Sequence, residues 1–208
     1  MSHELVGAPL DNGAAVAELI EQLNEPALRA AAGMFACLTA SIAGDQSRAV
    51  RLGRRAVAES KEEGASAFAP PMFAGWADMA LGGALVQLGQ ASEGIAQIDI
   101  GLARHRALPV RTMRSWFRAQ RALGLLQEGR HDEAATSIEA AITDIDDTGE
   151  RWPEPVVLAV LAEVRAARGA DQEEVADLLA KATQLIARQG SFGLTRWVDA
   201  SAARLVRT

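Results

Sequence analysis

The chain has 208 residues, of which 49% are hydrophobic and 23% charged, and its formal net charge is −6. This acidic balance argues against direct nucleic-acid binding, because nucleic-acid-binding surfaces are usually basic. The sequence contains no run of about 18 apolar residues and no signal-peptide pattern at its N-terminus, so we expect a cytoplasmic protein without a membrane span. A single cysteine, Cys37, excludes an internal disulfide and fits a reducing compartment.

The first predicted elements are a flexible segment over residues 1–12 and a short helix over 13–23. The stretch GAAVAELIEQL has apolar residues at helical spacing. We expect this helix to pack on the repeat that follows it.

Internal repeats organise the rest of the chain. Four glycines that precede short polar turns recur at separations of 45, 40 and 40 residues: Gly44, Gly89, Gly129 and Gly169. Helix breakers follow about twenty residues after each of them: Gly64, Pro109, Gly149 and Gly190. Each unit is therefore predicted to be a helix, a glycine turn, a second helix and a breaker. The units cover residues 26–64, 70–108, 109–149 and 152–190.

Small side chains recur at three fixed places in these units, seven residues before the turn glycine and five and twelve after it. The three sets are Cys37, Gly82, Ala122 and Ala162; Ala49, Gly94, Ala134 and Val175; and Ala56, Gly101, Ala141 and Ala182, with one residue inserted in the last unit. Small residues allow two helices to approach to the short end of the usual axial distance of about 8–10 Å. The pattern predicts four closely packed helical hairpins.

This pattern resembles the tetratricopeptide repeat over residues 26–190. It differs in its period of about 40 residues, where about 34 is usual, and in lacking the usual aromatic residue on the second helix. The resemblance implies an all-α fold of about ten antiparallel helices in a right-handed superhelix with a concave face. Residues 191–208 are expected to form a capping helix, with inward-facing residues Leu194, Trp197, Val198 and Leu205.

The C-terminal repeats have a narrower resemblance. The run TGERW at 148–152 and the run ARQG at 187–190, which a capping helix follows, are similar to the last repeats of large bacterial signalling proteins. These are class III adenylate cyclases with an ATPase module and activators of the maltose-regulator and LuxR types. The resemblance implies a helical sensor or docking module, without the catalytic or DNA-binding parts of those proteins.

A cluster of acids raises the question of a metal site: Asp144, Asp146, Asp147 and Glu150. As a calcium loop it fails, because Pro155 stands where a bidentate glutamate is required. We therefore expect these acids to be the polar end of a helix, and no metal. His131 is expected to be an exposed turn residue and Cys37 a packed, inert thiol. No motif for catalysis or cofactor binding is present.

The tetratricopeptide resemblance also implies which residues line the concave groove. Trp76 and Trp116 hold the same repeat position, thirteen residues before the turn glycine. The other groove positions are Met79, Gln87, Leu123, Gln127 and Glu163. Two stacked tryptophans would form an aromatic wall for a peptide or small ligand. The alternative is that both tryptophans belong to the core, where large aromatic residues mostly lie.

Four arginines recur at helical spacing within 109–128: Arg111, Arg114, Arg118 and Arg121. Such a stripe could hold an acidic segment or a phosphate group. The alternative is a solvated face that pairs with acids of neighbouring repeats, such as Asp78. Arg118 and Arg121 fall where the repeat expects packing residues, so either this helix is rotated or its register is shifted by one.

These observations predict a non-catalytic, regulatory or scaffolding module that binds a protein or peptide on its concave face. Two alternatives stay open, a small-molecule-sensing domain of a bacterial regulator and, with less support, an enzyme. A homodimer is also expected, since the ends of helical-repeat arrays are often apolar.

Overall fold

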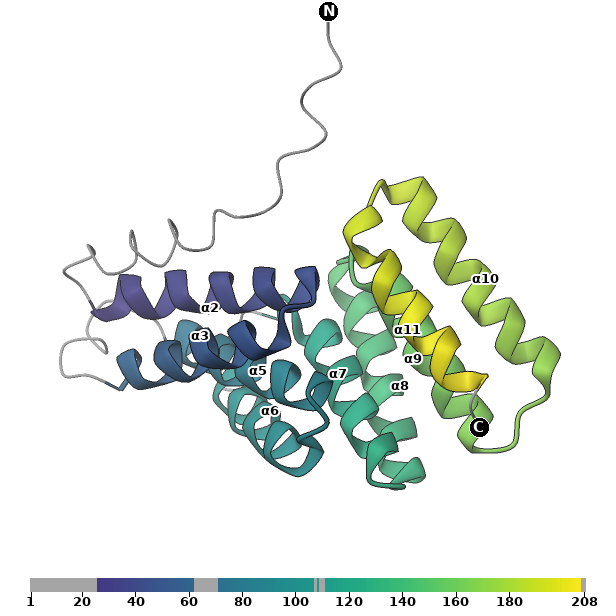
Figure 1. Cartoon of the computed structure of the whole chain (residues 1–208), viewed down its shortest axis with the longest axis horizontal. Helices are drawn as coiled ribbons and strands as arrows, with labels where there is room; N and C mark the ends of the chain where they lie inside the picture. The colour runs from purple at the N-terminus through teal and green to yellow at the C-terminus, as the bar shows by residue number, and fades with distance from the viewer. Residues whose placement is uncertain (1–25, 62–70, 107, 109–110, 207–208) are drawn as a thin grey trace, which may run out of the picture.

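The computed structural model describes residues 26–61, 71–106, 108 and 111–206. Within these ranges it contains nine α-helices, one short 3₁₀ helix and no strand (Figure 1). The elements are α2 (Pro26–Ala43), α3 (Gln46–Glu59), α5 (Pro71–Gln87), α6 (Ala91–Arg106), α7 (Arg114–Gln127), α8 (His131–Thr148), α9 (Glu154–Ala167), α10 (Gln172–Gln189), η1 (Phe192–Leu194) and α11 (Thr195–Leu205). The all-α class is confirmed. The predicted segments 1–12 and 13–23 lie outside the described residues.

Consecutive helices pair as antiparallel hairpins: α2 with α3, α5 with α6, α7 with α8, and α9 with α10. The first helices of the hairpins also contact one another in series, α2 with α5, α5 with α7 and α7 with α9. The second helices α3, α6 and α8 each contact the first helix of the next hairpin. This is the arrangement of a tetratricopeptide-like repeat. We call the surface of the row formed by α2, α5, α7 and α9 the inner face.

The sequence sets the helix ends through glycine turns and side-chain caps. Gly129, between α7 and α8, has a φ of 71°, and Gly149, which ends α8, has a φ of 70°. Glycine adopts this left-handed backbone without steric cost. At the starts of α3 and α10, the carboxylates of Asp45 and Asp171 accept hydrogen bonds from backbone N–H groups of the first turn, at 3.0 and 2.8 Å.

In the first two hairpins, small residues lie where the two helices cross, and the small residues of the other hairpins are mostly buried. A Cβ atom added to Gly82 would lie 2.6 Å from the carbonyl oxygen of Gly94, and one added to Gly94 would lie 2.7 Å from that of Gly82. In the first hairpin, the Cys37 Sγ lies 3.1 Å from the place of a Cβ on Gly53. Seven alanines at the predicted positions have no exposed surface: Ala49, Ala56, Ala122, Ala134, Ala141, Ala162 and Ala182. Val175 in the last unit is half-buried.

One ion pair occurs in both the second and third hairpins, with its charges exchanged. Asp78 lies 2.9 Å from Arg104 (Oδ2 to Nη1), and Arg118 lies 2.7 Å from Asp144 (Nε to Oδ2). Arg118 follows Asp78 by 40 residues, and Asp144 follows Arg104 by 40, which is the repeat period. Burial raises the pKa of the Asp78 carboxyl, against the lowering effects of Arg104 and Gln97. The half-buried Arg118 therefore stands at the repeat position of Asp78 and forms an ion pair where the repeat pattern expects a packing residue.

The C-terminal helix returns across the inner face. It contacts α9 and α10, while η1 contacts α2 near the other end of the array (Figure 1). Trp197 of α11 packs against Trp116 of α7, with ring centroids 4.9 Å apart. Leu194, Trp197 and Val198 are buried, and Leu205 is half-buried. The helix α11 therefore covers the part of the inner face beside α7 and α9.

Candidate functional site

A cavity of about 440 Å³ remains on the inner face beside the end of α11. It lies between the C-terminal ends of α7, α9 and α11, and we call it the inner pocket. Its lining residues are Leu123, Leu126, Gln127, His131, Glu163, Ala166, Ala167, Arg204 and Leu205. Leucine and alanine side chains form most of its wall. An apolar cavity with a few polar groups is the usual form of a ligand-binding site.

An ion pair ties α11 to α9 at the edge of the inner pocket. The guanidinium of Arg204 donates to both carboxylate oxygens of Glu163, at 2.7 and 2.8 Å, and to the hydroxyl oxygen of Ser201 at 3.1 Å. Glu163 is 7% exposed, so the pair is partly shielded from water. Two parallel hydrogen bonds fix the orientation of both side chains. The pair therefore holds the wall of the pocket in a defined position.

Three of the seven predicted groove residues meet in this pocket: Leu123, Gln127 and Glu163. Arg204 was not predicted from the sequence, and Leu205, which was expected to face inward, was not assigned to the groove; both residues complete the pocket. The signal for these two was their spacing, since they follow Trp197 by seven and eight residues and so share its face of a helix. That signal says which way the side chains point but not which helix they contact.

Three other predicted groove residues belong to the core, which corrects their assignment. Trp76, Met79 and Trp116 are 8%, 0% and 2% exposed. The seventh, Gln87, is half-buried and donates from Nε2 to the Oε1 of Gln120 at 2.8 Å. As folded, the three buried side chains offer almost no surface to a partner. A partner-binding role for Gln87 stays a prediction.

The two tryptophans of the repeat do not form one aromatic wall. Trp76 packs against Phe73 and His105, with centroid distances of 5.7 and 5.6 Å. Trp116 instead stacks on Trp152 at 5.2 Å and meets the edge of Trp197. Equivalent repeat positions therefore have different neighbours, because α11 reaches α7.

The arginine stripe contacts acids and a backbone carbonyl of the second and third hairpins. The closest nitrogens of Arg111, Arg118 and Arg121 lie 2.9, 2.7 and 2.7 Å from carboxylate oxygens of Asp147, Asp144 and Asp99. Arg114 donates from Nη2 to the carbonyl oxygen of His105 at 2.6 Å. Arg121 thus pairs with an acid of the neighbouring repeat, whereas Asp78, the example named for such an acid, pairs with Arg104 of its own hairpin.

Each acid of the 144–150 cluster has a protein partner. Asp144 and Asp147 contact the arginine stripe, and Asp146 lies 3.3 Å from Arg151. Glu150 accepts hydrogen bonds from the backbone N–H of Met113 at 2.7 Å and from the Nε1 of Trp152 at 2.9 Å. Among the residues that the structure describes, no group of three or more His, Cys, Asp or Glu side chains is placed to hold a metal ion.

Replacing Asp144 with alanine should lower the free energy of unfolding by about 1–2 kcal/mol. The carboxylate is 4% exposed and its loss leaves Arg118 without its ion-pair partner. Asp146→Ala is the matched control, since its side chain is 63% exposed and should change the free energy by less than about 0.5 kcal/mol. Urea denaturation measures both. Equal midpoints for the two variants would show that the Asp144 pair does not stabilise the hairpin.

Cys37 and His131 differ in their exposure to solvent. Cys37 is fully buried, and burial raises the pKa of its thiol to about 12, so the nucleophilic thiolate is scarce at neutral pH. His131 is exposed at the start of α8, on the edge of the inner pocket.

The fold has a known counterpart, although no protein-family model and no curated protein sequence matches the chain. The chain is similar in structure to Bacillus thuringiensis PlcR, seen in a crystal structure in complex with the peptide PapR7 and DNA. The TM-score is 0.70 at 14% identity, and the match covers 96% of this chain and 68% of that chain. The likeness is one of fold. It supports the helical-repeat architecture, and the resemblance to the adenylate cyclases and activators stays a prediction.

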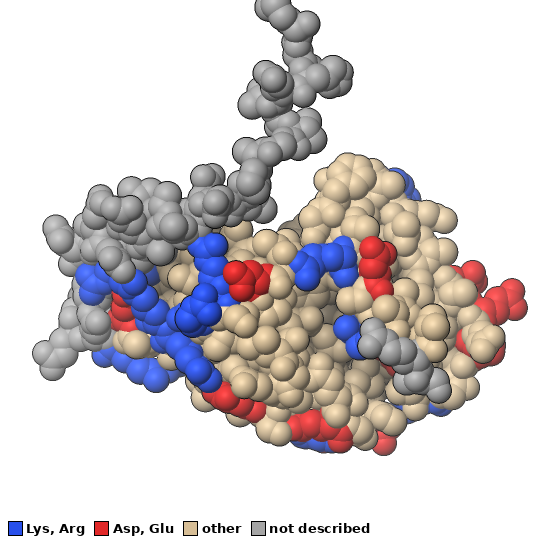
Figure 2. Space-filling model, in the orientation of Figure 1, with Lys and Arg blue, Asp and Glu red and all other residues tan. Residues whose placement is uncertain are grey.

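Positive charge gathers on one helix in spite of the net charge of −6. Four arginines and a single acid occur along α3, and Figure 2 shows Lys and Arg side chains gathered over this helix. The prediction of no direct nucleic-acid binding rests on the net charge alone. Because α3 has a basic surface, the net charge is not a sufficient argument for that prediction. No described helix has the length and hydropathy needed to cross a bilayer.

Proposed function

We propose that this chain is a non-catalytic regulatory module whose inner pocket binds a short segment of a peptide or protein partner. The observation that carries the proposal is the pocket itself, in which apolar side chains adjoin Gln127, Glu163 and Arg204. The similarly folded PlcR was crystallised with a peptide, which supports a peptide as the occupant. The resemblance of the C-terminal repeats to bacterial signalling proteins fits a regulatory role in the cytoplasm.

The chemistry of the pocket favours a peptide with one apolar anchor residue. Leu123, Leu126 and Leu205 supply apolar contact for that side chain. Gln127 donates from Nε2 to the carbonyl oxygen of Val86 at 3.2 Å, which leaves its Oε1 to accept a peptide N–H. Peptide binding therefore needs a buried side chain and at least one main-chain hydrogen bond.

The pocket also gives a route from binding to regulation. Its wall includes Arg204 and Leu205, so α11 contributes directly to the site. A peptide that contacts these residues stabilises the docked position of α11 over any displaced position. A ligand shifts a conformational equilibrium only through such a difference in affinity.

Selection of a displayed library of random peptides on the full chain tests this proposal. We expect the enriched peptides to share an apolar residue and to lose at least about tenfold in affinity for Ala167→Trp. Ala167 is an exposed residue on the pocket wall, so an indole there fills the cavity without disturbing the core.

The matched control is Ala180→Trp, which adds the same indole at an exposed position on α10 outside the pocket. It should leave the affinity unchanged. Failure to enrich any peptide, or equal binding by the wild type and Ala167→Trp, would show that the inner pocket is not a peptide-binding site.

A small-molecule sensor is the second candidate, because a volume of about 440 Å³ is within the usual range for small-ligand sites. A metabolite that raises the Tm of the wild type but not of Ala167→Trp would favour this candidate. A homodimer is compatible with both the peptide-binding and the small-molecule-sensing function. Light scattering of the full chain measures whether the homodimer forms.

A further inference from the structure

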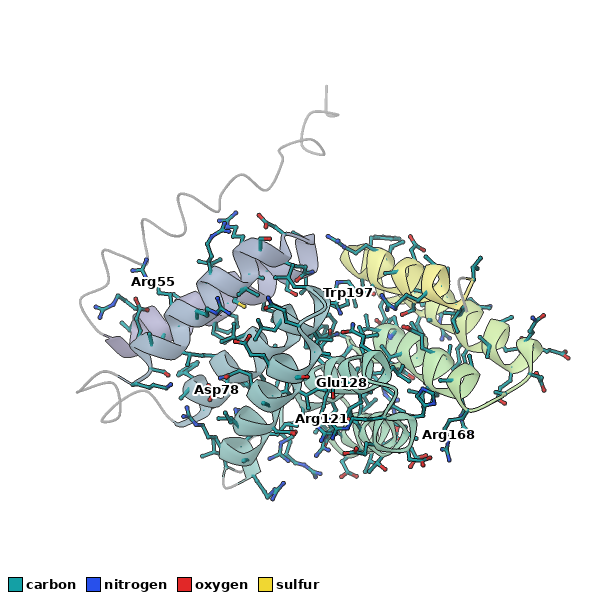
Figure 3. The ribbon with its side chains drawn as sticks, turned by 60° about the horizontal axis from the view of Figure 1, so that its bottom comes forward. Arg55, Asp78, Arg121, Glu128, Arg168 and Trp197 are labelled. Atoms are coloured by element: carbon teal, nitrogen blue, oxygen red, sulfur yellow. The ribbon has the colours of Figure 1, made fainter. Side chains whose placement is uncertain are left out.

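A second cavity, of about 450 Å³, lies between α6, α7 and α8. Four arginines line it, Arg106 at the end of α6 and Arg114, Arg118 and Arg121 along α7, and we call it the arginine pocket. The three α7 residues are four and three positions apart and so share one face of the helix, while Leu123 of the inner pocket lies about half a turn away. Figure 3 labels Arg121 near the middle of the array. The two cavities therefore use opposite faces of α7.

The arginine pocket has more positive than negative charge. Arg118 and Arg121 each have a carboxylate partner at 2.7 Å. Within the described ranges, no carboxylate oxygen forms an ion pair, at 4.0 Å or less, with a guanidinium nitrogen of Arg106 or Arg114. Among the described residues, these two positive charges on the wall of the cavity therefore have no direct ion-pair partner, in a chain whose net charge is −6.

Arg114 is held in place at the wall. Its Nη2 donates to the carbonyl oxygen of His105, while its Nε is buried and has no hydrogen-bond acceptor. Burial is the largest cause of the lowered pKa of Arg114; Asp144 raises this pKa, and Arg111, Arg118 and Arg106 lower it. Crowded guanidinium groups of this kind gain from an added anion, which reduces their mutual repulsion.

We propose that the arginine pocket binds the phosphate group of a small phosphorylated ligand. A phosphate monoester carries about −1.5 to −2 charges at neutral pH, which matches the two arginines without a direct ion-pair partner, whereas a monocarboxylate supplies one charge. Guanidinium groups bind phosphate through parallel N–H donors.

Among the other lining residues, Asp99 is the ion-pair partner of Arg121, and the rest leave room for the remainder of such a ligand. Leu102 and Ala140 form an apolar part of the wall. The hydroxyls of Thr136 and Ser137 each donate to a backbone carbonyl oxygen at 3.0 Å, so the arginines are the donors that face an anion. This site does not depend on peptide binding at the inner pocket, and either proposal can fail alone.

Calorimetric titration of the full chain with phenyl phosphate, at constant ionic strength, tests the proposal. We expect saturable binding, and a loss of about tenfold in affinity for Arg106→Gln. Arg106 is exposed, so this variant keeps the fold. Benzoate keeps the phenyl ring but supplies a single negative charge, and it should bind more weakly than phenyl phosphate.

Arg168→Gln is the matched control, because Arg168 is exposed, lies after α9 and pairs with Asp132. It should bind phenyl phosphate as the wild type does. Three results would overturn the proposal: no saturable binding at millimolar concentration, equal weakening by Arg106→Gln and Arg168→Gln, or equal affinity for benzoate. A DNA duplex that binds in an Arg106-dependent way, while phenyl phosphate does not bind, would also overturn it and assign the surface to nucleic acid.

Discussion

Replacing Trp197 with alanine should lower the free energy of unfolding by about 3–5 kcal/mol, the largest effect that we expect from one substitution. The indole is 7% exposed and meets the edge of Trp116, which also stacks on Trp152 at 5.2 Å. Removing it leaves a cavity among α7, α9 and α11 that the remaining rings cannot fill. Urea denaturation followed by far-ultraviolet circular dichroism measures the loss.

Phe192→Ala is the control for this substitution, because Phe192 is another large aromatic of the C-terminal segment but is 69% exposed. It should change the free energy by no more than about 0.5 kcal/mol. Limited proteolysis supplies a second measurement, since α11 should be cut faster in Trp197→Ala than in the wild type. An unchanged midpoint and an unchanged cleavage rate would mean that α11 is not docked through Trp197.

Replacing Gly82 with alanine should lower the free energy of unfolding by about 2–3 kcal/mol. Alanine is the better helix former by about 1 kcal/mol, so helix propensity alone predicts the opposite sign. The new methyl group would lie 2.6 Å from the carbonyl oxygen of Gly94 and 2.8 Å from the backbone nitrogen of Ile98. Both atoms belong to the backbone of α6, which can relieve the overlap only if the two helices separate.

Gly83→Ala provides a control at the next residue of the same helix. Its methyl group would meet only the side chain of Gln120, at 3.4 and 3.7 Å, which is ordinary contact. This variant should match the wild type or exceed it by up to about 1 kcal/mol. If Gly82→Ala proved as stable as Gly83→Ala, the close crossing of α5 and α6 would be refuted.

The hairpins were predictable from sequence because close helix packing requires small residues at particular repeat positions. Cys37, Gly82 and Ala122 hold one such position, and all three are buried. A steric requirement that recurs with every unit leaves a regular trace in the sequence. Asp78 and Arg118 also hold equivalent repeat positions, although their charges are opposite.

The path of α11 was not predictable from that trace. Trp197 was expected to face inward, but its contact with Trp116 depends on how far the array curves, and the repeat pattern does not encode curvature. The same limit explains why Trp76 and Trp116 differ in their surroundings. Arg106 was missed for another reason, since cations are common in the last turn of any helix and therefore mark no site.

Hydrogen–deuterium exchange of the full chain measures whether a peptide binds in the inner pocket. The experiment compares the free protein with the protein saturated by the strongest peptide from the library. We predict slower exchange at the C-terminal ends of α7 and α9 and in α11, with no change in α3. Protection confined to α6 and α8, or protection that does not include α11, would show that the peptide does not bind in the inner pocket.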